Sequence, residues 1–72
     1  MSATTTPPRL LRLPEVIAQT GMARTTLYDF IRAGTFPRPV PLTSTARAWV
    51  AAEVERWIAD RIAERDAQGG AP

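Results

Sequence analysis

Among the side chains that could act on another molecule, one group of arginines, threonines and a tyrosine lies between residues 24 and 32. Coiled as a helix, this stretch would carry polar side chains on one face: Arg24, Thr25, Tyr28, Asp29 and Arg32. The other face would carry Leu27, Phe30 and Ile31 at the i, i+3 and i+4 spacing of a buried stripe. Guanidinium and hydroxyl groups donate to phosphates and read base edges, so this spacing favours contact with nucleic acid.

Catalysis needs residues that this chain lacks. It has no histidine, the commonest general base and metal ligand, and no cysteine, which excludes disulfides and thiolate metal sites. The sequence also contains no glycine-rich phosphate loop and no carboxylate pair placed for acid–base chemistry. We therefore expect a protein that is not an enzyme and that uses no metal, no cofactor and no small-molecule ligand.

Two short helices separated by Gly21 would present the polar face. Pro14 and Glu15 favour a first helix over about residues 14–20, because proline and acidic residues suit a helix start. The second helix would run over about residues 24–33 and end at Gly34.

The residues around the turn occur at the offsets of a helix-turn-helix. Gly21 can adopt the left-handed backbone that ends a helix, and the apolar Met22 can fill the corner between the helices. Ile17 before the turn and Leu27 after it supply the two buried positions. Any helical hairpin with a glycine turn shares this spacing, so a DNA-binding motif and a plain helical hairpin both stay open at this point.

Extended segments and a third helix complete the predicted domain. Residues 9–13 form a short strand with Leu11 and Leu13 on one face, and residues 36–42 hold three prolines, which allow only an edge strand. Residues 47–50 form a further strand after a polar turn of four residues or more, and residues 51–67 repeat apolar side chains at helical spacing. The predicted fold is mainly α with a small antiparallel β-hairpin or sheet, a winged helix-turn-helix. It occupies residues 9–67, with disordered tails at 1–8 and 68–72.

Charge is distributed unevenly along the chain. Residues 1–50 carry a net charge of +4 and residues 51–72 carry −2, and all nine basic residues are arginine. These two parts suggest one face for a polyanion and another for solvent or protein, although a GC-rich coding sequence would also favour arginine. No apolar run approaches the ~20 residues that span a membrane, and residues 1–8 lack the features of a signal peptide. We therefore expect a cytoplasmic protein that does not enter a membrane.

A series of short motifs resembles one known family. The motifs are, in order, RLPEV, TGMARTTLY, AGTFPRPV, an arginine two residues before a tryptophan, and EVERWI. Over about residues 9–65 they resemble the AlpA-like group of phage and prophage regulators, within the MerR-like and excisionase winged-helix class. The resemblance implies a small DNA-binding protein without catalytic activity. Such proteins regulate transcription in mobile elements, or act as excisionases that bind and bend attachment-site DNA and direct an integrase toward excision.

The resemblance also assigns roles to individual residues. Its recognition-helix segment matches Arg24, Thr25, Thr26 and Tyr28, and its basic wing positions match Arg38 and Arg47. Its core positions match Leu27, Trp49 and Trp57.

Three residues depart from the family pattern. Asp29 stands where a basic residue is frequent, and its carboxylate opposes phosphate unless it accepts from a cytosine N4 or pairs with Arg32. Ala23 and Ala52 stand where a helix-capping residue is frequent. The missing caps predict a domain of marginal stability when free.

Several candidate contacts have a structural alternative. Thr25 and Thr26 either contact DNA or cap the start of their helix. Tyr28 either donates its hydroxyl to a phosphate or packs its ring against the wing. Arg47 either binds DNA or neutralises an acid of the last helix. The full set of candidate DNA contacts is Arg24, Thr25, Thr26, Tyr28, Asp29, Arg32, Arg38 and Arg47.

The sequence therefore predicts a sequence-specific binding protein of a phage or mobile element, with double-stranded DNA as its partner. An excisionase is the first expectation, an AlpA-like transcriptional regulator is the alternative, and a protein–protein adaptor is the second alternative. Further expected partners are a phage integrase and other copies of the chain, which would associate through repeated DNA sites or the last helix.

Overall fold

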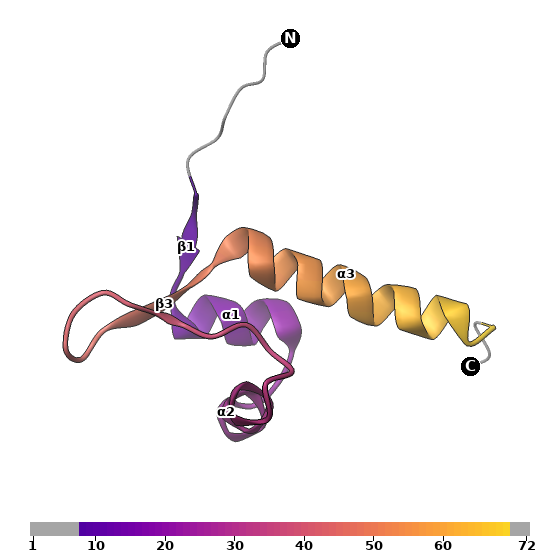
Figure 1. Ribbon diagram of the computed structural model, residues 1–72, viewed down its shortest axis with the longest axis horizontal. Helices are drawn as coiled ribbons and strands as arrows, with labels where there is room; N and C mark the ends of the chain where they lie inside the picture. The colour runs from indigo at the N-terminus through magenta and orange to yellow at the C-terminus, as the bar shows by residue number, and fades with distance from the viewer. Residues whose placement is uncertain (1–7, 70–72) are drawn as a thin grey trace, which may run out of the picture.

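The computed structural model describes residues 8–69 as three helices and a small sheet. The elements are, in order, β1 (Leu10–Leu11), α1 (Leu13–Thr20), α2 (Arg24–Ala33), β2 (Val40–Pro41), β3 (Arg47–Val50) and α3 (Ala51–Ala67). Helices α1 and α2 pack beside the sheet, the β2–β3 hairpin extends to one side, and α3 extends to the other (Figure 1). This arrangement confirms the predicted winged helix-turn-helix.

The predicted disordered tails fall almost entirely outside the described residues, since 1–7 and 70–72 are not described. Pro8 is exposed and has no regular structure. Gln68 and Gly69 form a hydrogen-bonded turn in which the Gly69 amide donates to the Asp66 carbonyl at 3.1 Å. Helix α3 ends at Ala67, as predicted, and the prediction of a disordered tail after it stays a prediction.

The turn between α1 and α2 has the predicted geometry. Gly21 has a φ of 74°, in the left-handed region, and its amide donates to the Ile17 carbonyl at 2.8 Å. A Cβ added at Gly21 would meet no atom within 4 Å, so the backbone conformation, and not crowding, calls for glycine here. Met22 packs against the core and fills the corner, as predicted.

Helix α1 begins one residue earlier than predicted, at Leu13. The Glu15 carboxylate accepts from the Arg12 amide at 2.9 Å, which makes Arg12 the N-cap residue. Leu13 is therefore helical, and β1 ends at Leu11 instead of extending to residue 13.

The three strands form one antiparallel sheet in the order β1-β3-β2. Leu11 pairs with Trp49 on one side of β3, and Pro41 pairs with Arg47 on the other. The proline lies on the edge strand β2, where its missing amide proton costs no ladder hydrogen bond. The hairpin loop spans residues 42–46, in line with the predicted long turn, and the Thr43 hydroxyl accepts from the Ala46 amide at 2.9 Å. This hairpin is the wing.

A single apolar core joins the sheet to all three helices. Its buried members are Leu11, Val16, Leu27, Phe36, Trp49, Ala51 and Val54. The Trp49 indole nitrogen donates to the Pro37 carbonyl at 3.1 Å, so the polar atom of this buried ring has a partner. Trp57 is only half-buried and packs edge-on against Phe36, with ring centroids 4.9 Å apart. The core roles predicted for Leu27 and Trp49 are confirmed, and Trp57 lies at the edge of the core.

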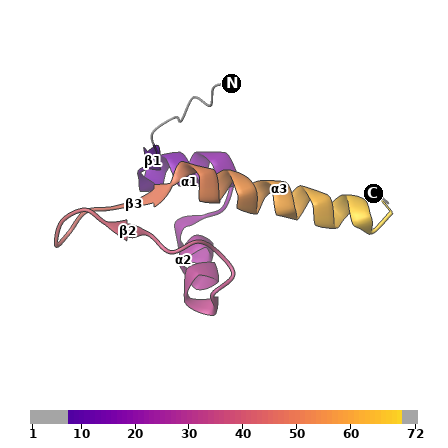
Figure 2. The same cartoon turned by 45° about the horizontal axis from the view of Figure 1, so that its top comes forward.

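Helix α3 starts in the core and then leaves it. Its N-cap is Val50, so the cap position expected at Ala52 is wrong by two residues. Along its apolar stripe Val54 is buried, Ile58 is half-buried and Ile62 is 47% exposed. The second half of the helix projects beyond the other elements in both views (Figures 1 and 2). Within residues 8–69, no helix combines the length and apolar character that crossing a membrane requires.

Candidate nucleic-acid interface

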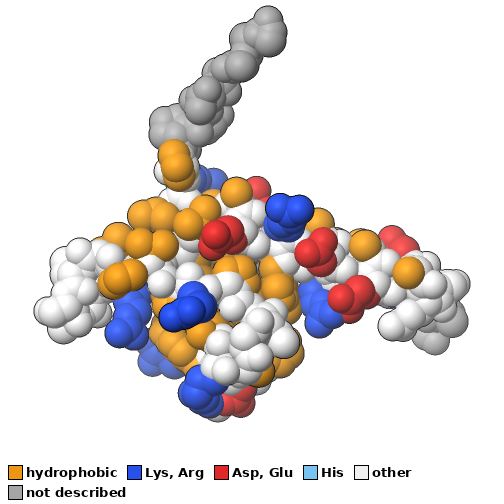
Figure 3. Space-filling view, viewed as in Figure 1, with side chains coloured by type: hydrophobic (Ala, Val, Ile, Leu, Met, Phe, Trp, Pro, Cys, Tyr) orange, Lys and Arg blue, Asp and Glu red, His pale blue; other side chains and the backbone are white. Residues whose placement is uncertain are grey.

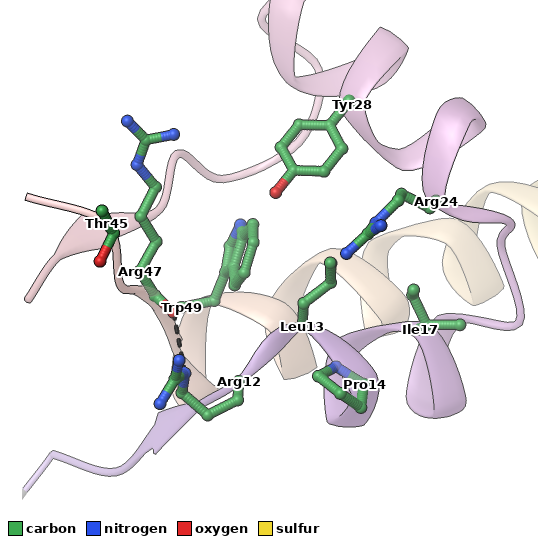
Figure 4. Close-up of a pocket in the computed structure, with 9 residues that line it drawn as sticks. All are labelled: Arg12, Leu13, Pro14, Ile17, Arg24, Tyr28, Thr45, Arg47 and Trp49. Atoms are coloured by element: carbon green, nitrogen blue, oxygen red, sulfur yellow. Dashed lines mark hydrogen bonds between the residues drawn. The ribbon is translucent and has the colours of Figure 1, made fainter.

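A hollow of about 660 Å³ opens between the start of α1, the start of α2 and the wing (Figure 4). Three arginines line it: Arg12 from α1's cap, Arg24 from α2 and Arg47 from β3. The remaining lining residues are Leu13, Pro14, Ile17, Tyr28, Thr45 and Trp49. No lining residue is acidic, so the hollow is a concave cationic surface suited to an anion. We call it the arginine groove.

Arg24 reaches the groove because it is the first residue of α2. In Figure 4 its side chain extends from the helix start toward the space between Leu13 and Tyr28. Ala23 is the N-cap residue and provides no side-chain hydrogen bond to the helix start. Among the described residues, no hydroxyl of Thr25 or Thr26 caps this helix end either, so that alternative is wrong. The start of α2 thus adds its free amides to the positive charge of Arg24.

Tyr28 serves both as packing and as part of the groove wall. Its half-buried ring meets Trp49 edge-on, with centroids 6.4 Å apart and planes at 64°. Packing against the wing strand is therefore confirmed. The hydroxyl points into the groove in Figure 4, where it is placed to donate to an anion. Its contact with a phosphate stays a prediction.

Arg12 is the groove residue that sequence reasoning missed. Its Nε donates to the Arg47 backbone carbonyl at 3.1 Å and so ties the start of α1 to the wing strand (Figure 4). Pro14 and Glu15 indicated a helix start shortly after this arginine, but no pattern in the sequence placed Arg12 beside the wing strand.

Arg47 does not neutralise an acid of α3. The ion pairs among the described residues join Arg32 to Asp29, Arg61 to Glu64 and Arg65 to Asp66. The structural alternative for Arg47 is therefore wrong, and its charge is available at the groove.

A second set of polar side chains lies on the outward side of α2. Successive helical residues are about 100° apart, which places Thr25, Asp29 and Arg32 opposite the buried Leu27. All three are exposed, and Leu27 is fully buried. We call them the outward row. The Asp29 carboxylate pairs with the Arg32 guanidinium at i+3, which is one of the two arrangements predicted for this acid.

Two predicted contact residues lie elsewhere. Arg38 precedes β2 and lines a separate hollow beside α3 together with Glu53, Arg56, Trp57 and Asp60. It lies near acidic residues and lines no part of the arginine groove. Thr26 is exposed. Around the axis of α2 it lies about 60° from Asp29, on the side of the helix that faces away from Arg24. The structure thus brings together Arg24, Tyr28 and Arg47 but not Arg38 or Thr26.

Charge is distributed unevenly over the folded surface. Figure 3 shows arginine side chains near the wing and α2, whereas α3 carries acidic side chains interspersed with arginines. The acidic excess of residues 51–72 thus lies on α3.

Comparison with known proteins gives the family. The sequence model of the family described as "Prophage CP4-57 regulatory protein (AlpA)" matches residues 9–62. The chain belongs to this family. The match confirms the AlpA-like resemblance, whereas the wider MerR-like grouping stays a prediction.

Two curated relatives place the match in context. The chain is 47% identical over 57 residues to the uncharacterized protein ORF88 of Enterobacteria phage P4, covering 79% of this chain and 65% of that protein. It is 41% identical over 59 residues to the DNA-binding transcriptional activator AlpA of Escherichia coli K12, covering 74% of this chain and 84% of that protein. The AlpA-family match spans the arginine groove and the outward row, so both lie in the part shared with the family.

Proposed function

We propose that this AlpA-family protein is a DNA-binding regulator of a phage or prophage. Helix α2 would enter the major groove with its outward row, while the arginine groove holds the flanking phosphate backbone. The observation that carries the proposal is that Arg12, Arg24 and Arg47 line one concave surface without acidic lining, beside the exposed face of α2.

The chemistry of the groove suits a phosphodiester strand. Guanidinium groups carry a positive charge and offer paired donors that match phosphate oxygens. The hollow is open and shared between two helix starts and a wing strand, which suits a strand passing through it. Neutralising about three phosphates would give a slope near −3 in a plot of log affinity against log salt concentration.

Transcriptional regulation is the first specific role. It is supported by the relative whose name describes a DNA-binding transcriptional activator, since 84% of that protein aligns with this chain. We place the target at a promoter of the mobile element.

Excisionase activity is the second specific role. One feature of the structure favours it: the second half of α3, from residue 59 to residue 67, is exposed throughout. A projecting helix leaves a surface for an integrase or for a neighbouring copy on repeated sites.

A gel-shift and bending assay on the DNA beside the gene tests these roles together. A single shifted band at a promoter fragment supports a transcriptional regulator, and stepwise bands with strong bending at an attachment site support an excisionase. Arg24→Ala and Arg47→Ala should each weaken binding, whereas Arg65→Ala, on the far part of α3, should not. Absence of binding by the wild type at low salt would leave the adaptor alternative.

A further inference from the structure

Among the candidate contacts, Asp29 is the one whose charge opposes DNA. It lies near the middle of α2's outward side, where the proposed function places the bases, and an unpaired carboxylate there would repel phosphates. The structure does not leave it unpaired, because the Arg32 Nη2 donates to Asp29 Oδ1. The Asp29 side chain is 55% exposed and the Arg32 side chain is 71% exposed, so both present a free edge to a ligand.

The geometry of this pair leaves donors available. An arginine guanidinium has five N–H donors, and the contact with Asp29 uses one N–H of Nη2. The second N–H of Nη2 and the nitrogen beside it, Nη1 or Nε, still form one free two-donor edge. Nη1 and Nε have no protein partner among residues 8–69, and neither has the second carboxylate oxygen of Asp29. A held guanidinium with a free donor edge matches guanine, whose N7 and O6 accept two parallel hydrogen bonds in the major groove.

We propose that Asp29 is a positioning residue that holds Arg32 for reading one guanine of the target site. The inference depends on the proposed function, since it assigns base recognition to the outward row and backbone contact to the arginine groove. Two consequences follow from the pairing. Asp29 reduces the rotamer freedom that Arg32 would lose on binding, and its charge weakens contact with DNA that lacks the guanine.

The opposite effects of Asp29 on specific and nonspecific DNA make it distinguishable from a merely structural residue. In Asp29→Asn the carboxylate charge is lost while the shape is kept. The variant should bind random duplex more tightly than the wild type and its target less selectively. A bidentate arginine–guanine contact discriminates by roughly 5- to 150-fold, so the preference for guanine at one position should fall by a factor in this range. Arg32→Ala should abolish the preference at that same position.

Selection of binding sites from a random duplex library, with the full chain, tests the proposal. The wild type should select a motif with one strongly preferred guanine, and both Asp29→Asn and Arg32→Ala should lose that preference and no other. Asp29→Glu should restore part of it, because glutamate also pairs with arginine at i+3. The matched control is Glu64→Gln, which breaks the equivalent exposed pair with Arg61 on α3 and should leave the motif unchanged.

The outcomes separate the two proposals. A clear wild-type motif that survives Arg32→Ala, or that Asp29→Asn leaves unchanged, overturns this inference and leaves the proposed function intact. Failure of the wild type to enrich any sequence, with no retention of duplex at low salt, overturns the proposed function and this inference with it. Thermal melting of each variant checks that a lost preference is not lost folding.

Discussion

Replacing Arg12 by alanine tests the arginine groove at the residue that sequence reasoning missed. The change removes one cation from the groove lining and the hydrogen bond from Nε to the Arg47 carbonyl, 3.1 Å long. If Arg12 neutralises one phosphate, the salt slope should become shallower by about 0.9. With equal affinities of variant and wild type at 1 M salt, the same relation gives an affinity loss of about 8-fold at 0.1 M salt and about 15-fold at 0.05 M.

The effect on folding should be small by comparison. The lost hydrogen bond is exposed, so it contributes on the order of 1 kcal/mol or less to the free energy of unfolding. For a domain of this size that corresponds to a fall in melting temperature of a few degrees, roughly 4–8 °C at most. Binding measured well below the melting temperature therefore reports the groove and not unfolding.

Fluorescence anisotropy with a labelled duplex, titrated at four or five salt concentrations, measures both the affinity and the slope. Arg12→Lys separates the two functions of the side chain, because lysine keeps the charge but cannot reproduce the Nε contact. It should keep a slope near that of the wild type. Arg65→Ala is the control for net charge, since it removes an arginine from the last turn of α3. An unchanged slope in Arg12→Ala, or an equal loss in Arg65→Ala, would refute the assignment of Arg12 to the groove.

Two further predictions concern the stability of the helix-turn-helix, both measured by thermal melting followed by circular dichroism. Gly21→Ala should lower the free energy of unfolding by about 1 kcal/mol or somewhat more, because the φ of 74° is unfavourable for alanine although the site has room for a Cβ; an unchanged melting temperature would contradict a left-handed turn. Ala23→Ser should raise the free energy of unfolding by about 0.5–2 kcal/mol, because a serine hydroxyl would cap the amides that alanine leaves free at the start of α2. A loss of stability would show that Ala23 is not the N-cap.

Local patterns gave most of the fold. The glycines that end α1 and α2 both have positive φ, at Gly21 and Gly34, where their position in the sequence predicted helix ends. The buried Leu27 follows from apolar spacing in the same way, whereas the buried Trp49 was indicated by the family resemblance. The helix ends and the burial of Leu27 depend on residues close in sequence, where backbone conformation and helical spacing are nearly independent of the rest of the chain.

The candidate site was less predictable, because it depends on contacts between distant segments. Arg12 joins the groove only because β1 and β3 pair, which brings residue 12 beside residue 47. Arg38 falls beside α3 because the segment before β2 runs past that helix, and the family's wing pattern did not reveal this. Residue spacing within one helix or strand predicts neither the contact of Arg12 with the wing strand nor the place of Arg38 beside α3.

The proposal that the arginine groove and α2 bind duplex DNA is tested most simply by locating the DNA-contacting surface in solution. Backbone amide resonances of the ¹⁵N-labelled chain would be followed while a duplex from the flanking DNA is added at low salt. The resonances that move should belong to the start of α1, to α2 and to the wing, around Arg12, Arg24 and Arg47, while those of α3 beyond Ile58 should stay in place. Shifts confined to α3, or none at any DNA concentration, would contradict the proposal.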